Sequence, residues 1–231
     1  MGRLNLEILR DPVYRIIGPL VAWLIRNRVH PNALTTAGFA VTLAAGLFFH
    51  QDHVRTAGLF VLLGGFFDLL DGRVARESGL ASKFGSFYDS TLDRISEIVV
   101  YLGLASLYNN IRPDLEDVAM VYVVMLAMGG SLMVSYTRAR AQGLGLDCKV
   151  GLMQRPERVV LLGVASMFFG LNFNGLFLDL VIIIVAVLTN LTAIHRIVWV
   201  HRHGAGIPLD DGPRRGFSPQ RSKGGVGDGT T

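Results

Sequence analysis

Two apolar segments joined by a polar one make up residues 56–108, which read TAGLFVLLGGFFDLLDGRVARESGLASKFGSFYDSTLDRISEIVVYLGLASLY. The apolar parts, residues 56–70 and 95–108, are each shorter than the roughly 20 residues that a membrane-spanning helix needs. We therefore expect each helix to continue through the polar part, to Arg76 and back to Gly85. Two helices would then project past the bilayer on the same side.

The rest of the chain repeats the apolar pattern. Hydrophobic residues make up 51% of the sequence and charged residues only 17%, against about 25% charged residues in an average soluble domain. A single cysteine excludes an internal disulfide. We predict an all-α, polytopic membrane protein with six transmembrane helices, at residues 32–49, 56–70, 95–108, 118–136, 158–173 and 176–200.

The two ends of the chain differ from its centre. In residues 1–30, apolar residues recur at helical spacing among several arginines, which is typical of an amphipathic helix lying in the membrane interface. A seventh spanning helix is the alternative there. Residues 204–231 hold few large apolar side chains and are expected to form a flexible tail. We thus predict an interfacial helix at 1–30, a transmembrane catalytic domain at 31–203 and a tail at 204–231.

The placement of basic residues predicts the orientation in the membrane. With six spans, 20 of the 22 lysines and arginines lie on one side, and only Arg55 and Arg112 lie on the other. Cytoplasmic loops carry the excess of lysine and arginine. We therefore expect a multi-pass protein of the plasma membrane with both termini in the cytoplasm. The loops after the second and fourth spans lie on that same side.

The polar part of the opening segment carries its acidic residues on one helix face. Asp68, Asp71, Gly72, Ala75 and Arg76 are spaced i, i+3, i+4, i+7 and i+8. Residues at these spacings lie on the same side of a helix. The face therefore presents two carboxylates and two small residues at the cytoplasmic end of the second span.

A second acidic face begins the next helix. Gly85, Asp89 and Asp93 are spaced i, i+4 and i+8, and a short turn separates them from the first run. The two faces are expected to meet and bring four carboxylates together. Such a cluster needs neutralisation, and Mg²⁺ favours oxygen ligands that it shares with substrate phosphates. Two metals roughly 3.5–4 Å apart fit four aspartates and a diphosphate.

Two plainer interpretations stand beside the metal site. In the first interpretation, the aspartates lie at solvated helix ends and form salt bridges with Arg73, Arg76 and Arg94. In the second they line the ion path of a transporter, although transport sites usually lie near the bilayer midplane. The small residues favour the metal site, because Gly72, Ala75 and Gly85 leave room for a bulky group such as a nucleotide.

The spacing Asp-x-x-Asp-Gly-x-x-Ala-Arg, eight residues, Gly-x-x-x-Asp-x-x-x-Asp resembles the signature of the CDP-alcohol phosphotransferase family, and every fixed position matches from Asp68 to Asp93. The resemblance implies transfer of a phosphatidyl group from a CDP-linked lipid, with release of CMP. It implies two divalent cations, Mg²⁺ or Mn²⁺, at Asp68, Asp71, Asp89 and Asp93, with Asp93 also the general base. It implies homodimers, and no nucleic-acid partner is expected.

The resemblance also implies a place for the donor lipid. Gly72, Arg76 and Gly85 would hold the CDP group. Asn32 and Thr35, in a Pro-Asn-x-x-Thr segment at residues 31–35, would lie near the nucleotide. An N-cap is the other role that Asn32 would serve, and the two roles are compatible.

Further basic residues at the same membrane face predict an anionic acceptor. Arginine binds phosphate in a bidentate manner, although anchoring to lipid headgroups accounts for part of such a set. The run Ser-Tyr-Thr-Arg-Ala-Arg-Ala at residues 135–141 resembles the phosphatidylinositol phosphate synthase branch of the family. That branch implies CDP-diacylglycerol as donor and inositol 1-phosphate as acceptor, with glycerol 3-phosphate as the alternative. The implied acceptor residues are Ser135, Arg138, Arg155, Arg158 and Arg196.

Overall fold

The computed structural model describes residues 6–111 and 117–206, and most of these residues are helical with no strand among them. The all-α class is therefore confirmed. Most of the predicted tail at 204–231 lies outside the described residues. The helices are α1 (Leu6–Arg26), α2 (Pro31–His50), α3 (Val54–Glu77), α4 (Lys83–Ile111), α5 (Asp117–Gly143), α6 (Arg155–Val164), a π-helical turn η1 (Ala165–Phe169), a 3₁₀ turn η2 (Asn172–Gly175) and α7 (Leu176–Gly204).

Three helical stretches are long and apolar enough to cross a membrane: Pro31–His50, Val118–Gly143 and Asn172–Gly204. They coincide with three of the six predicted spans. The other three predicted spans lie within α3, within α4, and across α6 and η1. α3 runs on to Glu77 and α4 begins at Lys83, so the expected continuation of both helices through the polar segment is confirmed. A total of six spans stays a prediction.

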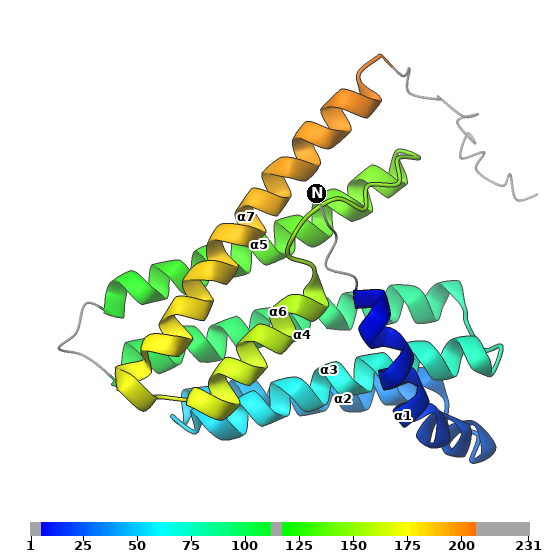
Figure 1. The fold of residues 1–231 in the computed structure, drawn as a ribbon, viewed down its shortest axis with the longest axis horizontal. Coiled ribbons are helices and arrows are strands. Elements are labelled where there is room, and N and C mark those ends of the chain that lie inside the picture. Colours follow the sequence, from blue (N-terminus) through cyan, green and yellow to red (C-terminus); the bar gives the residue numbers. More distant parts are fainter. Residues whose placement is uncertain (1–5, 112–116, 207–231) are drawn as a thin grey trace, which may run out of the picture.

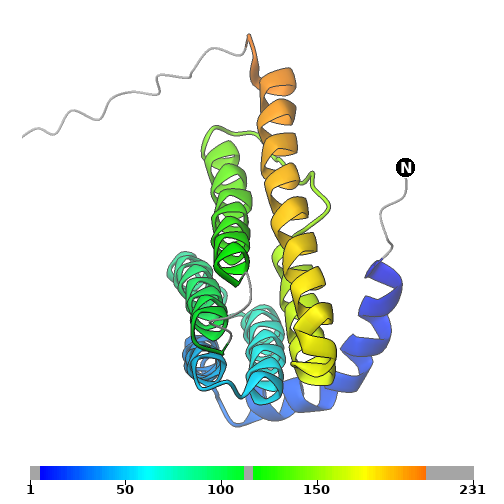
Figure 2. The ribbon, with the colours of Figure 1, turned by 90° about the vertical axis from the view of Figure 1, so that its left-hand side faces the viewer.

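The helices pack as a bundle in which α2 lies against both α3 and α4, and α5 joins α4 to α7 (Figures 1 and 2). α6 and η1 cover α3. The core contains Ala45, Phe49 and Ala57 from the first half of the chain and Leu178, Ile182 and Val185 from α7. A buried hydrogen bond of 2.9 Å between the Tyr101 and Ser131 hydroxyls links α4 to α5.

Glycines let neighbouring backbones approach closely. A Cβ on Gly58 of α3 would lie 2.4 Å from the Met167 backbone nitrogen and 2.8 Å from the Gly163 carbonyl oxygen. A Cβ on Gly103 of α4 would lie 2.6 Å from the carbonyl oxygen of Gly46 in α2. Small residues at helix contacts are a general feature of membrane proteins, where close packing replaces the hydrophobic effect as the source of association.

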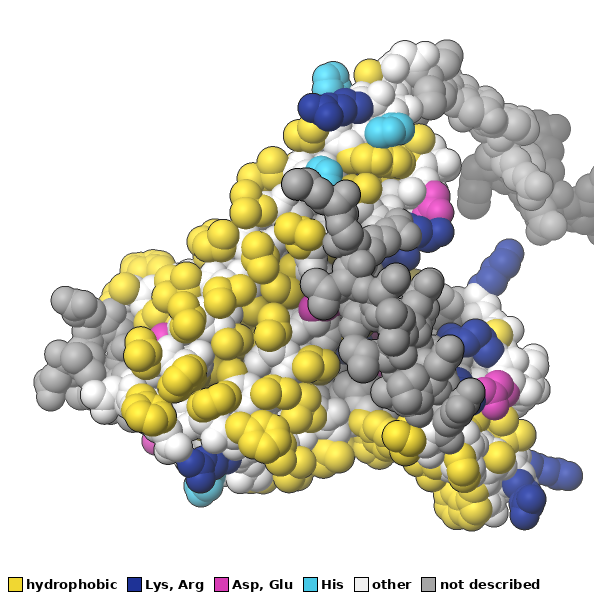
Figure 3. All heavy atoms as spheres, in the orientation of Figure 1, with side chains coloured by type: hydrophobic (Ala, Val, Ile, Leu, Met, Phe, Trp, Pro, Cys, Tyr) yellow, Lys and Arg dark blue, Asp and Glu magenta, His cyan; other side chains and the backbone are white. Residues whose placement is uncertain are grey.

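The outside of the bundle is strongly apolar. Many apolar side chains are at least half exposed, among them Leu126, Leu180, Val187 and Ile194. Figure 3 shows apolar side chains covering much of the visible face, with most of the visible lysine and arginine side chains toward its upper and right-hand parts. An apolar surface of this extent, together with three helices long and apolar enough to cross a membrane, is typical of a membrane protein.

α1 crosses the polar end of α2 and α3 (Figure 1). Val21 and Leu24 of α1 pack with Leu34 of α2 and with Leu70 and Val74 of α3 in a small separate core. Part of the segment 1–30, Leu6–Arg26, is helical, and the inner face of this helix covers the part of α3 that carries the first acidic residues, whereas its amphipathic character stays a prediction. Its location at the membrane interface stays a prediction.

Enlarging Gly58 is expected to separate α3 from the α6–η1 segment. Gly58→Ala places a methyl group against backbone atoms that cannot rotate away, and overpacking of this kind costs about 1–3 kcal/mol. The apparent melting temperature in detergent should fall by several degrees. Gly129→Ala is the control, because nothing lies within 4 Å of a Cβ there. An unchanged melting temperature for Gly58→Ala would show that the contact is not tight.

Candidate active site

The acidic faces of α3 and α4 meet as the sequence predicts. Asp68 and Asp71 from α3 and Asp89 from α4 each offer a carboxylate oxygen, and these oxygens lie within 4.8 Å of one another. The non-helical residues 78–82 form the turn between the two helices. It is short enough to bring the end of α3 against the start of α4.

Asp71 is the most buried member of this group. Its exposure is 4%, and its Oδ2 atom has no hydrogen-bond partner. Burial raises the pKa of Asp71 to about 6, although a hydrogen bond from Thr35 opposes the shift. A buried, unpartnered carboxylate oxygen between two further carboxylates is a donor set that suits a hard divalent cation. The residues present therefore fit a metal.

Asp93 lies apart from that group in this structure and is held by arginine. Its Oδ1 is 2.9 Å from Nη2 of Arg155, and its Oδ2 is 3.7 Å from Nη1 of Arg94. Nη1 of Arg155 bonds Asp68. Burial and the charge of Asp89 raise the pKa of Asp93, while its arginine contacts favour the carboxylate and oppose that rise.

A cleft of about 190 Å³ opens beside the carboxylates between α2, α3 and α4. Asp71 and Asp89 form part of its wall. The five residues predicted to lie at the CDP group all line this one cleft as well. These residues are Asn32, Thr35, Gly72, Arg76 and Gly85.

Local geometry explains why small residues line the cleft. A Cβ on Gly85 would lie 3.2 Å from the Asn32 amide oxygen, and a Cβ on Gly72 would lie 3.4 Å from Nη1 of Arg76. Larger residues at either position would push these polar groups or fill the cleft. The glycines therefore keep the Asn32 amide and the Arg76 guanidinium beside open space.

The structure corrects one detail at the start of α2. His30 is the N-cap residue, and its Nδ1 atom accepts a hydrogen bond from the Asn32 backbone nitrogen at 3.2 Å. The N-cap role considered for Asn32 is therefore wrong, because Pro31 already begins the helix. The Asn32 side chain faces the cleft instead.

Ser82 is a cleft residue that the sequence analysis did not identify. It immediately precedes α4, and its hydroxyl accepts a hydrogen bond from the Gly85 backbone N–H at 3.0 Å. A serine directly before a helix is a common capping signal. The signal was present in the sequence, and it fixes the first turn of α4 at the cleft.

The predicted acceptor residues divide into two groups. Ser135 and Arg138 of α5 are half-buried, whereas Arg196 of α7 is buried and bonds the protein itself. Arg196 donates from Nε to the Val150 carbonyl at 2.8 Å and from Nη1 to the Val134 carbonyl. It thereby ties α7 to α5 and to the segment before α6.

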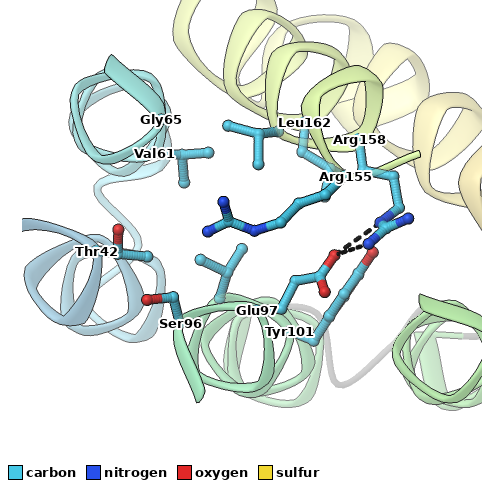
Figure 4. A pocket seen from close by; sticks show the side chains of 11 residues that line it. Thr42, Val61, Gly65, Ser96, Glu97, Tyr101, Arg155, Arg158 and Leu162 are labelled. Carbon is cyan, nitrogen blue, oxygen red and sulfur yellow. Dashed lines mark hydrogen bonds and ion pairs between the residues drawn. The ribbon is translucent and has the colours of Figure 1, made fainter. Parts of the chain in front are cut away.

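Arg158 also bonds a protein group. It is 1% exposed, and its Nη2 lies 2.6 Å from Oε1 of Glu97 (Figure 4). Glu97 was not predicted from the sequence, although it follows Asp93 by one helical turn and an intramembrane carboxylate is itself a functional signal. Arg138 and Arg158 both lie near enough to Arg196 to repel its charge. The predicted arginines therefore lie near one another, but Arg158 and Arg196 already bond groups of the protein itself.

Arg155 is the predicted acceptor residue that reaches the aspartates. Figure 4 shows its side chain extending from α6 into a pocket lined by Gly65 of α3 and Ser96 of α4. Burial lowers the pKa of Arg155 to about 10, and repulsion from Arg158 contributes. The guanidinium therefore stays charged at neutral pH.

Residues 28–194 match the model of the CDP-alcohol phosphatidyltransferase family. The chain belongs to this family. It is 38% identical over 198 residues to the phosphatidylinositol phosphate synthase of Streptomyces avermitilis, covering 83% of this chain and 80% of that protein. It is 33% identical over 191 residues to the archaetidylinositol phosphate synthase of Methanothermobacter thermautotrophicus, covering 83% and 91%.

Solved structures of the family support the same relationship. The phosphatidylinositol phosphate synthase of Mycobacterium tuberculosis with CDP-DAG bound has a TM-score of 0.73 and 28% identity, covering 81% of this chain and 94% of that chain. The same enzyme in complex with manganese and citrate has a TM-score of 0.71 at 28% identity, covering 79% and 87%.

Membership in the family makes the chain a metal-dependent transferase of substituted phosphate groups. The transporter interpretation is therefore set aside. The interpretation of the aspartates as solvated helix ends also fails to account for the buried Asp71 oxygen, which has no hydrogen-bond partner. Of the arginines considered for that role, Arg73 instead pairs with Glu77 at 2.7 Å.

Replacing Asp71 by asparagine is expected to weaken Mn²⁺ binding to the purified protein by more than about tenfold, since even second-shell changes cost about 10–100-fold. The same change removes a buried charge, so the metal-free variant should melt no lower than the wild type. Thermal melting with and without Mn²⁺ measures both effects. Glu77→Gln, which changes an exposed carboxylate on the same helix, should alter neither. Wild-type Mn²⁺ affinity in Asp71→Asn would contradict the metal site.

Proposed function

We propose that the enzyme transfers a phosphatidyl group from CDP-diacylglycerol to inositol 1-phosphate, releasing CMP and forming phosphatidylinositol phosphate. The observation that carries the proposal is the cleft beside Asp71 and Asp89, because all the candidate donor-binding residues line it. The relatives reported above are named archaetidylinositol phosphate synthase and phosphatidylinositol phosphate synthase, and these names support inositol phosphate as the acceptor. The solved relative with CDP-DAG bound supports the donor.

The donor lies in the cleft with its cytidine between α2, α3 and α4. Gly72 and Gly85 leave space for the nucleotide, and the Arg76 guanidinium faces its phosphates. The Asn32 amide and the Thr35 hydroxyl border the same space. Because Asp71 and Asp89 line the same cleft, the diphosphate of a bound donor lies near these carboxylates and the cations that they hold.

Asp68, Asp71, Asp89 and Asp93 hold two divalent cations in this proposal, with Mg²⁺ as the physiological metal and Mn²⁺ as a substitute. When bound, the cations neutralise the donor diphosphate and stabilise the charge that develops during phosphoryl transfer. The protein contributes position. α3 supplies two of the carboxylates and α4 supplies the other two.

Asp93 is the general base. Its carboxylate takes the proton from the attacking hydroxyl of the acceptor as that oxygen forms a bond to the lipid-side phosphorus. The bond from this phosphorus to the CMP oxygen breaks, CMP leaves with the electron pair, and the proton passes from Asp93 to solvent. The place of Asp93 on the helix that also carries Asp89, beside Arg155, supports this role, because it puts a carboxylate next to both the proposed metal site and the proposed acceptor site.

The acceptor phosphate binds among the arginines of α5, α6 and α7. Ser135 and Arg138 are half-buried and accessible to a ligand, and Arg155 lies beside Asp93. Arg158 and Arg196 contribute positive electrostatic potential to the acceptor site. They also link the surrounding helices, through Glu97 and through two backbone carbonyls respectively. An anionic acceptor is thus drawn toward the base.

We place the enzyme in the plasma membrane with six spans and with the site and both termini in the cytoplasm. The excess of basic residues on one side supports this orientation. Residues 1–30 form an interfacial helix, 31–203 the catalytic domain and 204–231 a flexible tail. The enzyme is a homodimer in this proposal.

Measuring CMP release identifies the acceptor. With Mg²⁺ and CDP-diacylglycerol, we expect the purified enzyme to release CMP when inositol 1-phosphate is present and not with inositol. Glycerol 3-phosphate is the competing acceptor, and a CDP-archaeol donor is a parallel arm, because one relative is an archaetidyl enzyme. Release with glycerol 3-phosphate alone would preserve the aspartate chemistry and overturn the acceptor.

Asp93→Asn is expected to lower kcat by about 100-fold or more, because general-base catalysis contributes about 10²–10⁴-fold. Binding of Mn²⁺ and of CDP-diacylglycerol should remain measurable, since the three carboxylates grouped within 4.8 Å are unchanged. Single-turnover assays at saturating substrate separate chemistry from binding. Substantial turnover by the variant would remove Asp93 from the role of base.

A further inference from the structure

Arg155 joins the two acidic helices. It is the first residue of α6, and its guanidinium bonds Asp68 of α3 while lying 2.9 Å from Asp93 of α4. Both aspartates belong to the set expected to bind metal. A bidentate guanidinium matches two carboxylate oxygens in geometry and in charge.

This position makes Arg155 a competitor of the metal for Asp68. Each Asp68 oxygen that bonds a guanidinium loses lone-pair capacity for a cation, and the two positive groups repel each other at short range. We propose that Arg155 is a tethered counter-cation. In the metal-free enzyme it neutralises Asp68 and Asp93 and keeps α3 and α4 together, and metal loading displaces it.

The side chain is able to move while its helix stays in place. Arg158, one turn further along α6, is fixed by Glu97 and by the Met153 carbonyl. The Arg155 Nε atom, in contrast, is buried without a hydrogen-bond partner. Among the described residues, the polar contacts that hold the Arg155 guanidinium in this conformation are therefore those of its tip to the two aspartates.

Displacement has a consequence for the second substrate. A guanidinium released from Asp68 and Asp93 remains beside the general base and becomes available to the phosphate of the acceptor. Metal loading would then complete the acceptor site, so that the anionic acceptor binds tightly only after the metal. This consequence rests on the proposed function, whereas the displacement itself does not.

The first test measures Mn²⁺ binding to the full chain in detergent, without either substrate, by the loss of the free-ion electron paramagnetic resonance signal. Arg155→Gln removes the competing cation, so we expect it to bind Mn²⁺ about tenfold more tightly than the wild type. Arg155→Lys keeps the charge without the bidentate geometry, and its Mn²⁺ affinity should lie between those of the wild type and Arg155→Gln. Arg73→Gln removes a cation that pairs with Glu77 and should match the wild type. Equal or weaker binding by Arg155→Gln would overturn the proposal.

A second test uses the wild-type enzyme and does not depend on how the variants fold. An arginine-selective dicarbonyl reagent followed by mass spectrometry reports the accessibility of each guanidinium. We expect Mn²⁺ to increase the labelling of Arg155 severalfold and to leave Arg158 unlabelled, because Arg158 stays paired with Glu97. Labelling of Arg155 that is unchanged or reduced by Mn²⁺ would show that the guanidinium is not displaced.

The coupling to the acceptor is tested with inositol 1-phosphate by calorimetry. Mn²⁺ should tighten its binding to the wild type and should have a smaller effect on Arg155→Gln. If Mn²⁺ tightened inositol 1-phosphate binding equally in the wild type and in Arg155→Gln, the proposed coupling would be overturned. If inositol 1-phosphate binds in neither metal state while Mn²⁺ still displaces Arg155, the tethered counter-cation stands and the proposed acceptor fails.

Discussion

Mutual repulsion among carboxylates is the constraint on which the rest of the structure depends. Asp68, Asp71 and Asp89 lie within 4.8 Å of one another, and Asp71 is almost completely buried. Such a group is stable only with cations beside it. The protein supplies guanidinium groups, including those of Arg155 from α6 and Arg94 from α4, and a divalent metal is the cation that comes from solution. The site is therefore a balance between internal and external positive charge.

The close packing of the bundle gives this balance a fixed frame. α2 lies against both acidic helices, and glycine contacts leave little freedom for α3 to move relative to the α6–η1 segment. Arg158 and Arg196 lock the same region from within through Glu97 and backbone carbonyls. In such a frame, an exchange of cations is expected to move side chains more than helices.

Sequence reasoning found the acidic faces and the cleft residues because helical spacing and small residues are local signals. The i, i+3 spacing of Asp68 and Asp71 and the i, i+4 spacing of Gly85 and Asp89 fix which side chains share a face on each helix before any contact is known. The partners of Arg155, Arg158 and Arg196 were not predictable in this way. They lie 87, 61 and 62 residues away in sequence. Only the packing of α6 beside α3 and α4, and of α7 against α5, brings them together. His30 was missed as a cap because Pro31 moves the helix start by one residue.

The position of the site at one end of the bundle bears on how the membrane grows. Under the proposed function, a donor bound in the cleft has its acyl chains in the leaflet at that end, and nothing in the proposed reaction moves those chains. Donor and product therefore occupy the same leaflet, while the water-soluble acceptor and CMP exchange with the adjoining solution. Each turnover leaves the number of lipids in that leaflet constant and changes only the headgroup. Delivery of the product to the opposite leaflet is then a task for a separate lipid-flipping activity.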